Sequence, residues 1–225
     1  MVYWELKTAK MFRIVFLWLS SVGYISCNDY KTDKVQLPYY NEPTFTPVFI
    51  NEISNVEEKI THSIGDFSFL NEDSIVVDQK SIEDKIHIAN FIFTSCGSIC
   101  PTMTRNLKIV SDSLKNFENL VFLSYSVTPW IDKPYKLKKY KERNGIANNN
   151  WHFLTGNKGD IYKLARQSYF AEEDIGYSKD STEFLHTEHF ILVDKTKRIR
   201  GIYNGTLTLE MQQLIEEIKI LYEEK

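Results

Sequence analysis

The segment KIHIANFIFTSCGSICPTMTRNLKIV, residues 85–110, decides the expected fold of this chain. Its first part, Lys85–Ser95, is an almost unbroken apolar run rich in β-branched and aromatic residues, which predicts a strand buried on both faces. Its last part has apolar residues at helical spacing and Pro101 near the start, which predicts a helix. Two cysteines, Cys96 and Cys100, lie in the short loop between these elements.

The rest of the chain continues this alternation of strands and helices. Residues 65–80 contain two short β-rich runs around a turn-forming Asn-Glu-Asp and predict a hairpin. The later elements are expected as a strand at 119–129, a helix at 133–145, a short strand at 150–156, a helix at 157–170, two strands within 188–205 and an amphipathic helix at 208–225. This order predicts an α/β protein with a thioredoxin-like fold and an N-terminal β-hairpin extension.

The composition is that of a globular protein and excludes some classes. The chain has 225 residues, of which 43% are hydrophobic and 25% charged, with a net charge of -3. This length fits one domain with an N-terminal extension, and the charge argues against a nucleic-acid partner. The most basic stretch, Lys133–Arg143, is expected to be a solvated helix face. Three cysteines are too few for a disulfide scaffold.

The first 27 residues have the layout of a secretory signal. Lys7, Lys10 and Arg13 precede a short apolar run at residues 14–25. This run is shorter than the roughly 20 residues that a membrane-spanning helix needs. Translation from Met11 would leave a still more compact signal.

Cys27 closes this segment and resembles the cysteine of a bacterial lipoprotein signal, which carries lipid and becomes the mature N-terminus. Tyr24 departs from the leucine-like residue that is usual in such signals. The likeness to a lipoprotein signal predicts lipidation of Cys27, with an uncleaved anchor or an incidental cysteine as alternatives. Export would place the other two cysteines in an oxidising compartment. Residues 28–60 are expected to form a polar tether that leads into a domain spanning residues 61–225.

The position of Cys96 and Cys100 predicts reactive thiols. The unpaired amides and the dipole at the start of a helix stabilise thiolate over thiol. Thiolates attack disulfides, and they also bind soft ions such as Cu(I). Three residues separate the cysteines, rather than the two of a thioredoxin-type redox pair, and this wider loop suits a chelate. The spacing alone leaves a structural disulfide, a redox dithiol and a metal site open.

A third metal ligand could come from one of five histidines. His62, His87 and His152 are expected to have surface or packing roles. His186 and His189 precede the C-terminal pair of strands, and in a thioredoxin-like sheet the loop before that pair lies beside the cysteine loop. His189 is expected to begin the strand, so His186 in the loop is the preferred ligand.

These segments together resemble the Sco/SenC family of copper proteins, which assist the assembly of cytochrome c oxidase. The resemblance extends from about Pro38 to the C-terminus and rests on FIFTSCGSICPTMTRNL (residues 91–107), FLSYSVTPWIDKP (122–134), NWHFLTG (150–156) and FLHTEHFILVDKTKRIRGIYNGT (184–206). It implies a thioredoxin-like fold and copper bound by Cys96, Cys100 and His186.

The resemblance implies a copper chaperone that delivers Cu(I) or Cu(II) to the binuclear copper subunit of the oxidase. It would be exported and held to the membrane by its lipid anchor, with a thiol reductase or another copper chaperone as further partners. A thiol–disulfide oxidoreductase that acts through the same dithiol, Cys96 and Cys100, is the alternative, and a copper or redox sensor is a third possibility.

Two sequence features bear on these alternatives. The segment before the C-terminal strands contains no proline, whereas thioredoxin-type reductases carry a cis-proline there, and this disfavours a general reductase. Thr128 stands where members of the family often have an aspartate, with Asp132 a little further on. This substitution leaves the role of that aspartate open.

Overall fold

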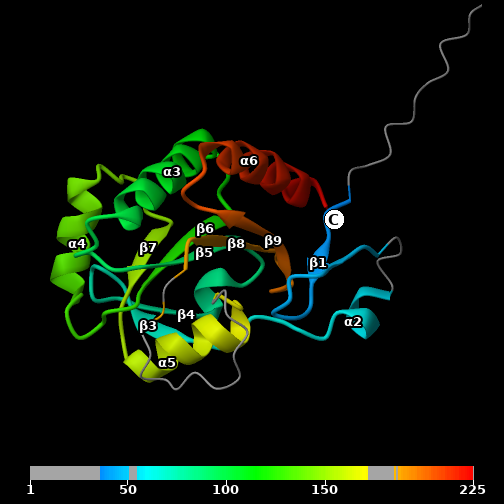
Figure 1. Cartoon of the computed structure of the whole chain (residues 1–225), viewed down its shortest axis with the longest axis horizontal. Coiled ribbons are helices and arrows are strands. Elements are labelled where there is room, and N and C mark those ends of the chain that lie inside the picture. Colours follow the sequence, from blue (N-terminus) through cyan, green and yellow to red (C-terminus); the bar gives the residue numbers. More distant parts are fainter. Residues whose placement is uncertain (1–35, 51–54, 172–184, 186, 225) are drawn as a thin grey trace, which may run out of the picture. The chain divides into compact units, whose positions relative to one another are not determined.

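The computed structural model describes residues 36–50, 55–171, 185 and 187–224, which belong to one compact unit, Gln36–Lys225. A seven-stranded sheet in the order β2-β1-β9-β8-β5-β6-β7 forms its centre (Figure 1). The strands are β1 (Tyr39–Tyr40), β2 (Pro47–Val48), β5 (Ile86–Ile92), β6 (Leu120–Ser126), β7 (Trp151–Leu154), β8 (His189–Val193) and β9 (Ile199–Asn204).

The strand β5 lies between β8 and β6 in the sheet. It pairs parallel with β6 and antiparallel with β8, so that Ile88 lies opposite both Phe122 and Leu192. Every residue of β5 and of β6 is buried. This confirms the prediction that these apolar runs form strands covered on both faces.

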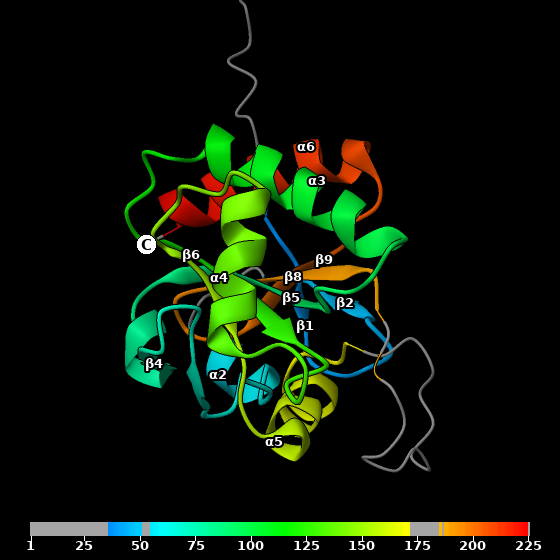
Figure 2. The ribbon, with the colours of Figure 1, turned by 90° about the vertical axis from the view of Figure 1, so that its left-hand side faces the viewer.

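Helices cover both faces of the sheet. Figures 1 and 2 show α3 (Ile99–Ser113) and α6 (Thr208–Glu223) on one face and α5 (Lys158–Lys163) on the other. The helix α4 (Pro134–Arg143) contributes to the same hydrophobic core as α3, while η3 (Leu164–Ser168) continues α5. Among the described residues, no helix is both long and apolar enough to span a bilayer.

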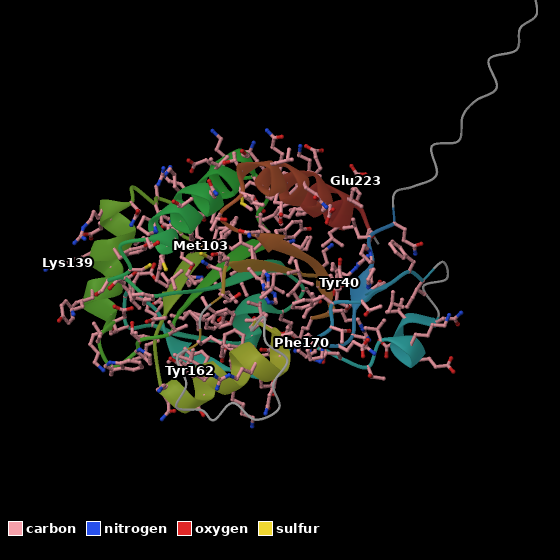
Figure 3. The ribbon with its side chains drawn as sticks, in the orientation of Figure 1. Tyr40, Met103, Lys139, Tyr162, Phe170 and Glu223 are labelled. Atoms are coloured by element: carbon pink, nitrogen blue, oxygen red, sulfur yellow. The ribbon has the colours of Figure 1, made fainter. Side chains whose placement is uncertain are left out.

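A hydrophobic core lies on each face of the sheet. Met103 of α3 lies in one core with Leu107 and Leu214. Tyr162 of α5 lies in the core on the other face, where Tyr125 and Tyr169 are also buried. Figure 3 shows Met103 and Tyr162 on opposite sides of the sheet. The sheet therefore has the two-sided cover that an α/β domain requires.

The expected hairpin is present as a separate two-stranded sheet. It consists of β3 (Ser68–Leu70) and β4 (Val76–Asp78), and it is followed by the short helix η2 (Gln79–Ile82). Two backbone hydrogen bonds join Leu70 to Thr155 at the end of β7, at 3.0 and 2.9 Å. The hairpin thus extends the thioredoxin-like core, as the sequence predicted.

The compact unit begins at Gln36, within the segment 28–60 that the sequence predicts as a tether and an entry into the domain. From Gln36 on, this segment packs onto the sheet and includes α2 (Val56–Lys59). Tyr40 of β1 pairs with Ile199 of β9. Residues 36–60 are mostly polar and contain prolines, but a few widely spaced apolar residues in this segment are buried, namely Leu37, Ile50 and Ile60. Burial of these side chains offsets the entropy lost when the segment is ordered.

A buried arginine fixes this N-terminal segment in place. Arg200 of β9 is only 2% exposed. Its guanidinium donates to the carbonyl oxygens of Leu37 at 3.0 Å and Pro38 at 3.1 Å, and to the carboxylates of Asp194 at 3.3 Å and Glu224 at 2.7 Å. One planar group with five donors therefore joins the start of the domain, the sheet and the end of α6.

Replacing Arg200 with lysine is expected to lower the free energy of unfolding by about 1–3 kcal/mol. A lysine keeps the charge, but its three donors cannot serve all four acceptors. Urea denaturation would measure the change. The matched control is Arg143→Lys on the exposed end of α4, where the change should stay within about 0.5 kcal/mol. Equal effects of the two substitutions would contradict the role given to Arg200.

Candidate metal and redox site

The two cysteines lie where β5 passes into α3. The strand ends at Ile92 and the helix begins at Ile99, two residues before Pro101, which therefore stands in the first turn as predicted. Cys96 lies in the connecting loop and is partly exposed, whereas Cys100 in the first helical turn is buried. Both thiols are free, so the structure shows the reduced pair.

The two thiols have opposite electrostatic environments. Partial burial raises the pKa of the Cys96 thiol, but hydrogen bonds to its sulfur from the amides of Cys100 and Ser98 outweigh this, and the pKa falls below the ordinary value of 9.0. Burial raises the pKa of the Cys100 thiol to about 12, and the nearby charge of Cys96 adds to the rise. The helix start thus lowers the pKa of the exposed thiol, while the buried thiol is shielded.

A buried carboxylate supports the cysteine loop. Asp132 is 0% exposed. Its oxygens accept hydrogen bonds from the Thr94 amide at 3.1 Å and the Thr94 hydroxyl at 2.5 Å, and from the hydroxyls of Ser126 at 2.7 Å and Thr128 at 2.9 Å. Thr94 stands two residues before Cys96, so Asp132 fixes the backbone from which the first thiolate projects.

Thr128, at the position where the family often has an aspartate, belongs to the hydrogen-bond network around Asp132. Its side chain donates to Asp132 and its backbone amide donates to the Ser126 hydroxyl at 3.1 Å. The sequence had left the role of this position open, and it had given Asp132 no role. In the sequence, Asp132 is recognisable only as a carboxylate shortly after a buried strand. Its burial depends on the pairing of β5 with β6, which the local sequence does not show.

A tyrosine closes the site from α4. The Tyr140 hydroxyl lies 2.7 Å from the Thr104 hydroxyl of α3, and both residues are buried. Burial is the main cause that raises the pKa of Tyr140, and the charges of Cys100, Cys96 and Asp132 add to it. Tyr140 of α4 therefore stays neutral, and its hydroxyl is held by Thr104 of α3.

The expected third ligand, His186, lies outside the described residues. The topology supports the neighbourhood proposed for its loop, because Ala89 of β5 pairs antiparallel with Ile191 of β8. The start of β8 at His189 therefore lies beside the end of β5, where the cysteine loop begins. The residues on either side, Leu185 and Thr187, are both buried. Cys27, the expected lipid site, also lies outside the described residues.

The other histidines have packing environments. His87 is fully buried, with Nε2 lying 3.1 Å from the Tyr169 hydroxyl, and burial lowers its pKa to about 3. His62 stacks on Phe170, and its Nε2 lies 2.8 Å from the Ser168 carbonyl oxygen. His189 begins β8, as predicted. Within the described ranges, no group of three or more His, Cys, Asp or Glu residues could hold a metal ion.

Comparison with known proteins decides the family. The family model described as SCO1/SenC matches residues 56–223. The chain belongs to the SCO1/SenC family. A curated relative, the SCO1 protein homolog of Bacillus subtilis (strain 168), is 30% identical over 167 residues, which are 73% of this chain and 85% of the relative.

Solved structures of Sco proteins share this architecture. A SCO1/SenC family lipoprotein from Bacillus anthracis str. Ames is 28% identical with a TM-score of 0.64, over 72% of this chain and 96% of that chain. BsSco, described as a Sco-family cytochrome c oxidase assembly protein with a disulfide switch, is 29% identical with a TM-score of 0.61, over 73% and 95%. Bradyrhizobium japonicum ScoI with copper bound, at 23% identity and a TM-score of 0.56 over 71% and 99%, shows the fold alone. The SCO1/SenC chain described here therefore has the thioredoxin-like fold expected from its sequence.

The unequal thiols of this SCO1/SenC protein give a direct prediction for alkylation. At neutral pH, iodoacetamide should modify Cys96 at least about tenfold faster than Cys100, because the lowered pKa of Cys96 favours its thiolate while burial raises the pKa of Cys100 to about 12. Peptide mapping by mass spectrometry would separate the two sites. In urea the two rates should converge, and equal rates in the native protein would contradict the environments described above.

Asp132→Asn is expected to destabilise the protein by about 1–3 kcal/mol, because the amide turns one acceptor into a donor that faces the Thr94 and Ser126 donors. Chemical denaturation would measure the loss. Asp112→Asn, at an exposed position of α3 where the carboxylate pairs only with Lys108, should change stability by about 0.5 kcal/mol or less. A loss for Asp132→Asn no larger than that of the control would show that the network does not support the loop.

Proposed function

We propose that this SCO1/SenC protein binds copper through Cys96, Cys100 and His186 and delivers it to the binuclear copper subunit of cytochrome c oxidase during assembly. The observation that carries the proposal is the pair of free cysteines at the start of α3, with Cys96 partly exposed and Cys100 buried. Membership of the SCO1/SenC family supports it, as does the oxidase-assembly relative of the same fold.

The donor set suits a copper ion that must be both held and released. Two thiolates hold Cu(I) in a low-coordinate site, and an added imidazole nitrogen allows a higher-coordinate Cu(II) site. Binding of copper displaces the Cys100 proton, because only the thiolate is a ligand. The high pKa of Cys100 therefore makes copper release easier as the pH falls, since protonation of this sulfur competes with the metal.

Copper titration of the reduced protein under anaerobic conditions tests the proposal. One Cu(I) per chain is expected, and thiolate-to-Cu(II) absorption should appear on loading with Cu(II). The variant His186→Ala should weaken Cu(II) binding at least tenfold and Cu(I) binding much less. The control His62→Ala removes a histidine that packs on Phe170 and should leave both affinities unchanged. Equal loss of both oxidation states in His186→Ala would remove that residue from the ligand set.

A thiol–disulfide oxidoreductase is the second candidate, and the unequal pKa values of the thiols favour it specifically. An exposed thiolate, Cys96, can attack a substrate disulfide, and the sheltered thiol of Cys100 can then resolve the mixed disulfide. Turnover of a model disulfide by the metal-free protein, abolished by Cys96→Ser, would support this function. The two activities are compatible, because the same dithiol, Cys96 and Cys100, can serve both.

We further propose that the protein is exported and held to the membrane through lipid on Cys27. The signal-like sequence of residues 1–27 supports this, together with the description of the Bacillus anthracis relative as a lipoprotein. Mass spectrometry of the membrane fraction would detect diacylglyceryl-modified Cys27 as the mature N-terminus. The domain would then work at the outer face of the membrane, where the copper site of the oxidase is assembled.

A further inference from the structure

Large apolar side chains are exposed on the turn that precedes α4 and in the first turn of that helix. Trp130 is 50% exposed, Ile131 37% and Tyr135 60%. Isolated apolar residues on a surface are ordinary, but here three of six consecutive positions are large, apolar and exposed. We call Trp130, Ile131 and Tyr135 the Trp130 surface. Tryptophan and tyrosine are the residues most enriched at the energetic centres of protein interfaces.

The Trp130 surface is linked directly to the cysteine loop. The turn is closed by hydrogen bonds from the amides of Ile131 and Asp132 to the Thr128 carbonyl oxygen, both at 2.8 Å. The side chain of Asp132, next to Ile131, holds Thr94. Two residues of chain, at most about 7 Å, separate Thr94 from Cys96. The turn that carries Trp130 and Ile131 and the loop that carries Cys96 are thus anchored to the same carboxylate.

Positive charge surrounds the Trp130 surface. Lys158 of α5 lies over the Trp130 ring, with Nζ 5.3 Å from the ring centroid. Lys133 and Lys136 stand between Ile131 and the body of α4, and among the described residues neither forms an ion pair with a carboxylate. Lys138 and Lys141, further along α4, do form ion pairs with carboxylates. The rim is therefore basic on a chain whose net charge is -3.

We propose that the Trp130 surface is the docking site for the protein with which copper is exchanged, and that this partner presents an acidic rim around exposed copper ligands. The inference rests on the proposed function. Copper passes between proteins by ligand exchange, in which the metal is bonded to donors from both at once. Such direct bonds require the partner to cover the surroundings of Cys96, and the Trp130 surface is joined to the cysteine loop through Asp132.

The position of the surface in the domain favours a protein over a lipid bilayer. The helix α4 packs near β7, at one edge of the sheet, whereas β1 and β2 form the opposite edge (Figure 1). The chain enters the described domain at Gln36, beside β1. A domain tethered from that side presents the Trp130 surface away from the tether. A second copy of this chain is disfavoured, because pairing two such surfaces would bring like-charged lysines together.

Copper transfer from the full-length copper-loaded protein to the metal-free copper domain of an oxidase subunit tests the proposal. Trp130→Ser should raise the concentration needed for half-maximal transfer rate roughly tenfold or more. Its Cu(I) affinity, measured by competition with a chelator, should be unchanged. Lys133→Glu combined with Lys136→Glu should also slow transfer and reduce its dependence on salt.

The matched control is Phe49→Ser, which removes an aromatic residue that is 61% exposed. It follows β2, which lies five positions from β6 in the sheet, or about 24 Å away. Transfer by this variant should equal that of the wild type. If the wild type transfers copper and Trp130→Ser transfers it with the same concentration dependence, the docking proposal is overturned while the proposed function stands. Absence of transfer from the wild type would overturn both.

Photocrosslinking identifies the occupant directly. The full-length variant Ile131→p-benzoylphenylalanine, placed in vesicles containing anionic lipid together with the oxidase domain, should crosslink to that domain. A matched variant with the same group at Phe49 should not. Crosslinks from position 131 to lipid, or to a second copy of this chain, would overturn the assignment of a copper-exchanging partner.

Discussion

The Asp132 carboxylate accepts hydrogen bonds from Thr94, Ser126 and Thr128, and the arrangement of the site depends on this network. Thr94 follows β5 and Ser126 ends β6, so the carboxylate joins the ends of two parallel strands. A buried carboxylate is costly unless it is fully hydrogen-bonded. The four donors meet that requirement, and in doing so they fix both the cysteine loop and the turn that carries Trp130 and Ile131.

The same geometry accounts for the uneven chemistry of the two thiols. Cys96 lies in the loop, where the amides at the start of α3 point at its sulfur, while Cys100 lies in the first turn of the helix and packs in the core below α3. A copper site and a redox pair can both use this difference, which is why the thiols alone do not separate the two functions.

The domain has two opposite ends with separate tasks. At one edge of the sheet, Arg200 ties the N-terminal segment and the end of α6 to β9. At the other end, the cysteine loop and the Trp130 surface are held by Asp132. Each end relies on one buried charged group with several hydrogen-bonding partners, and the two groups are independent of each other.

The sequence by itself determined the order of strands and helices, the reactive character of Cys96 and Cys100, and the family. These follow from local patterns, since β5 and α3 are encoded by period and composition within residues 85–110. Only the tertiary structure decided the roles of Asp132, Thr128 and Arg200. Asp132 and Arg200 have partners on distant segments, and a polar residue looks the same in sequence whether it is solvated or buried among donors. It also decided that residues from Gln36 onward belong to the fold, because a few spaced apolar side chains stabilise a segment only when a sheet edge is present to receive them.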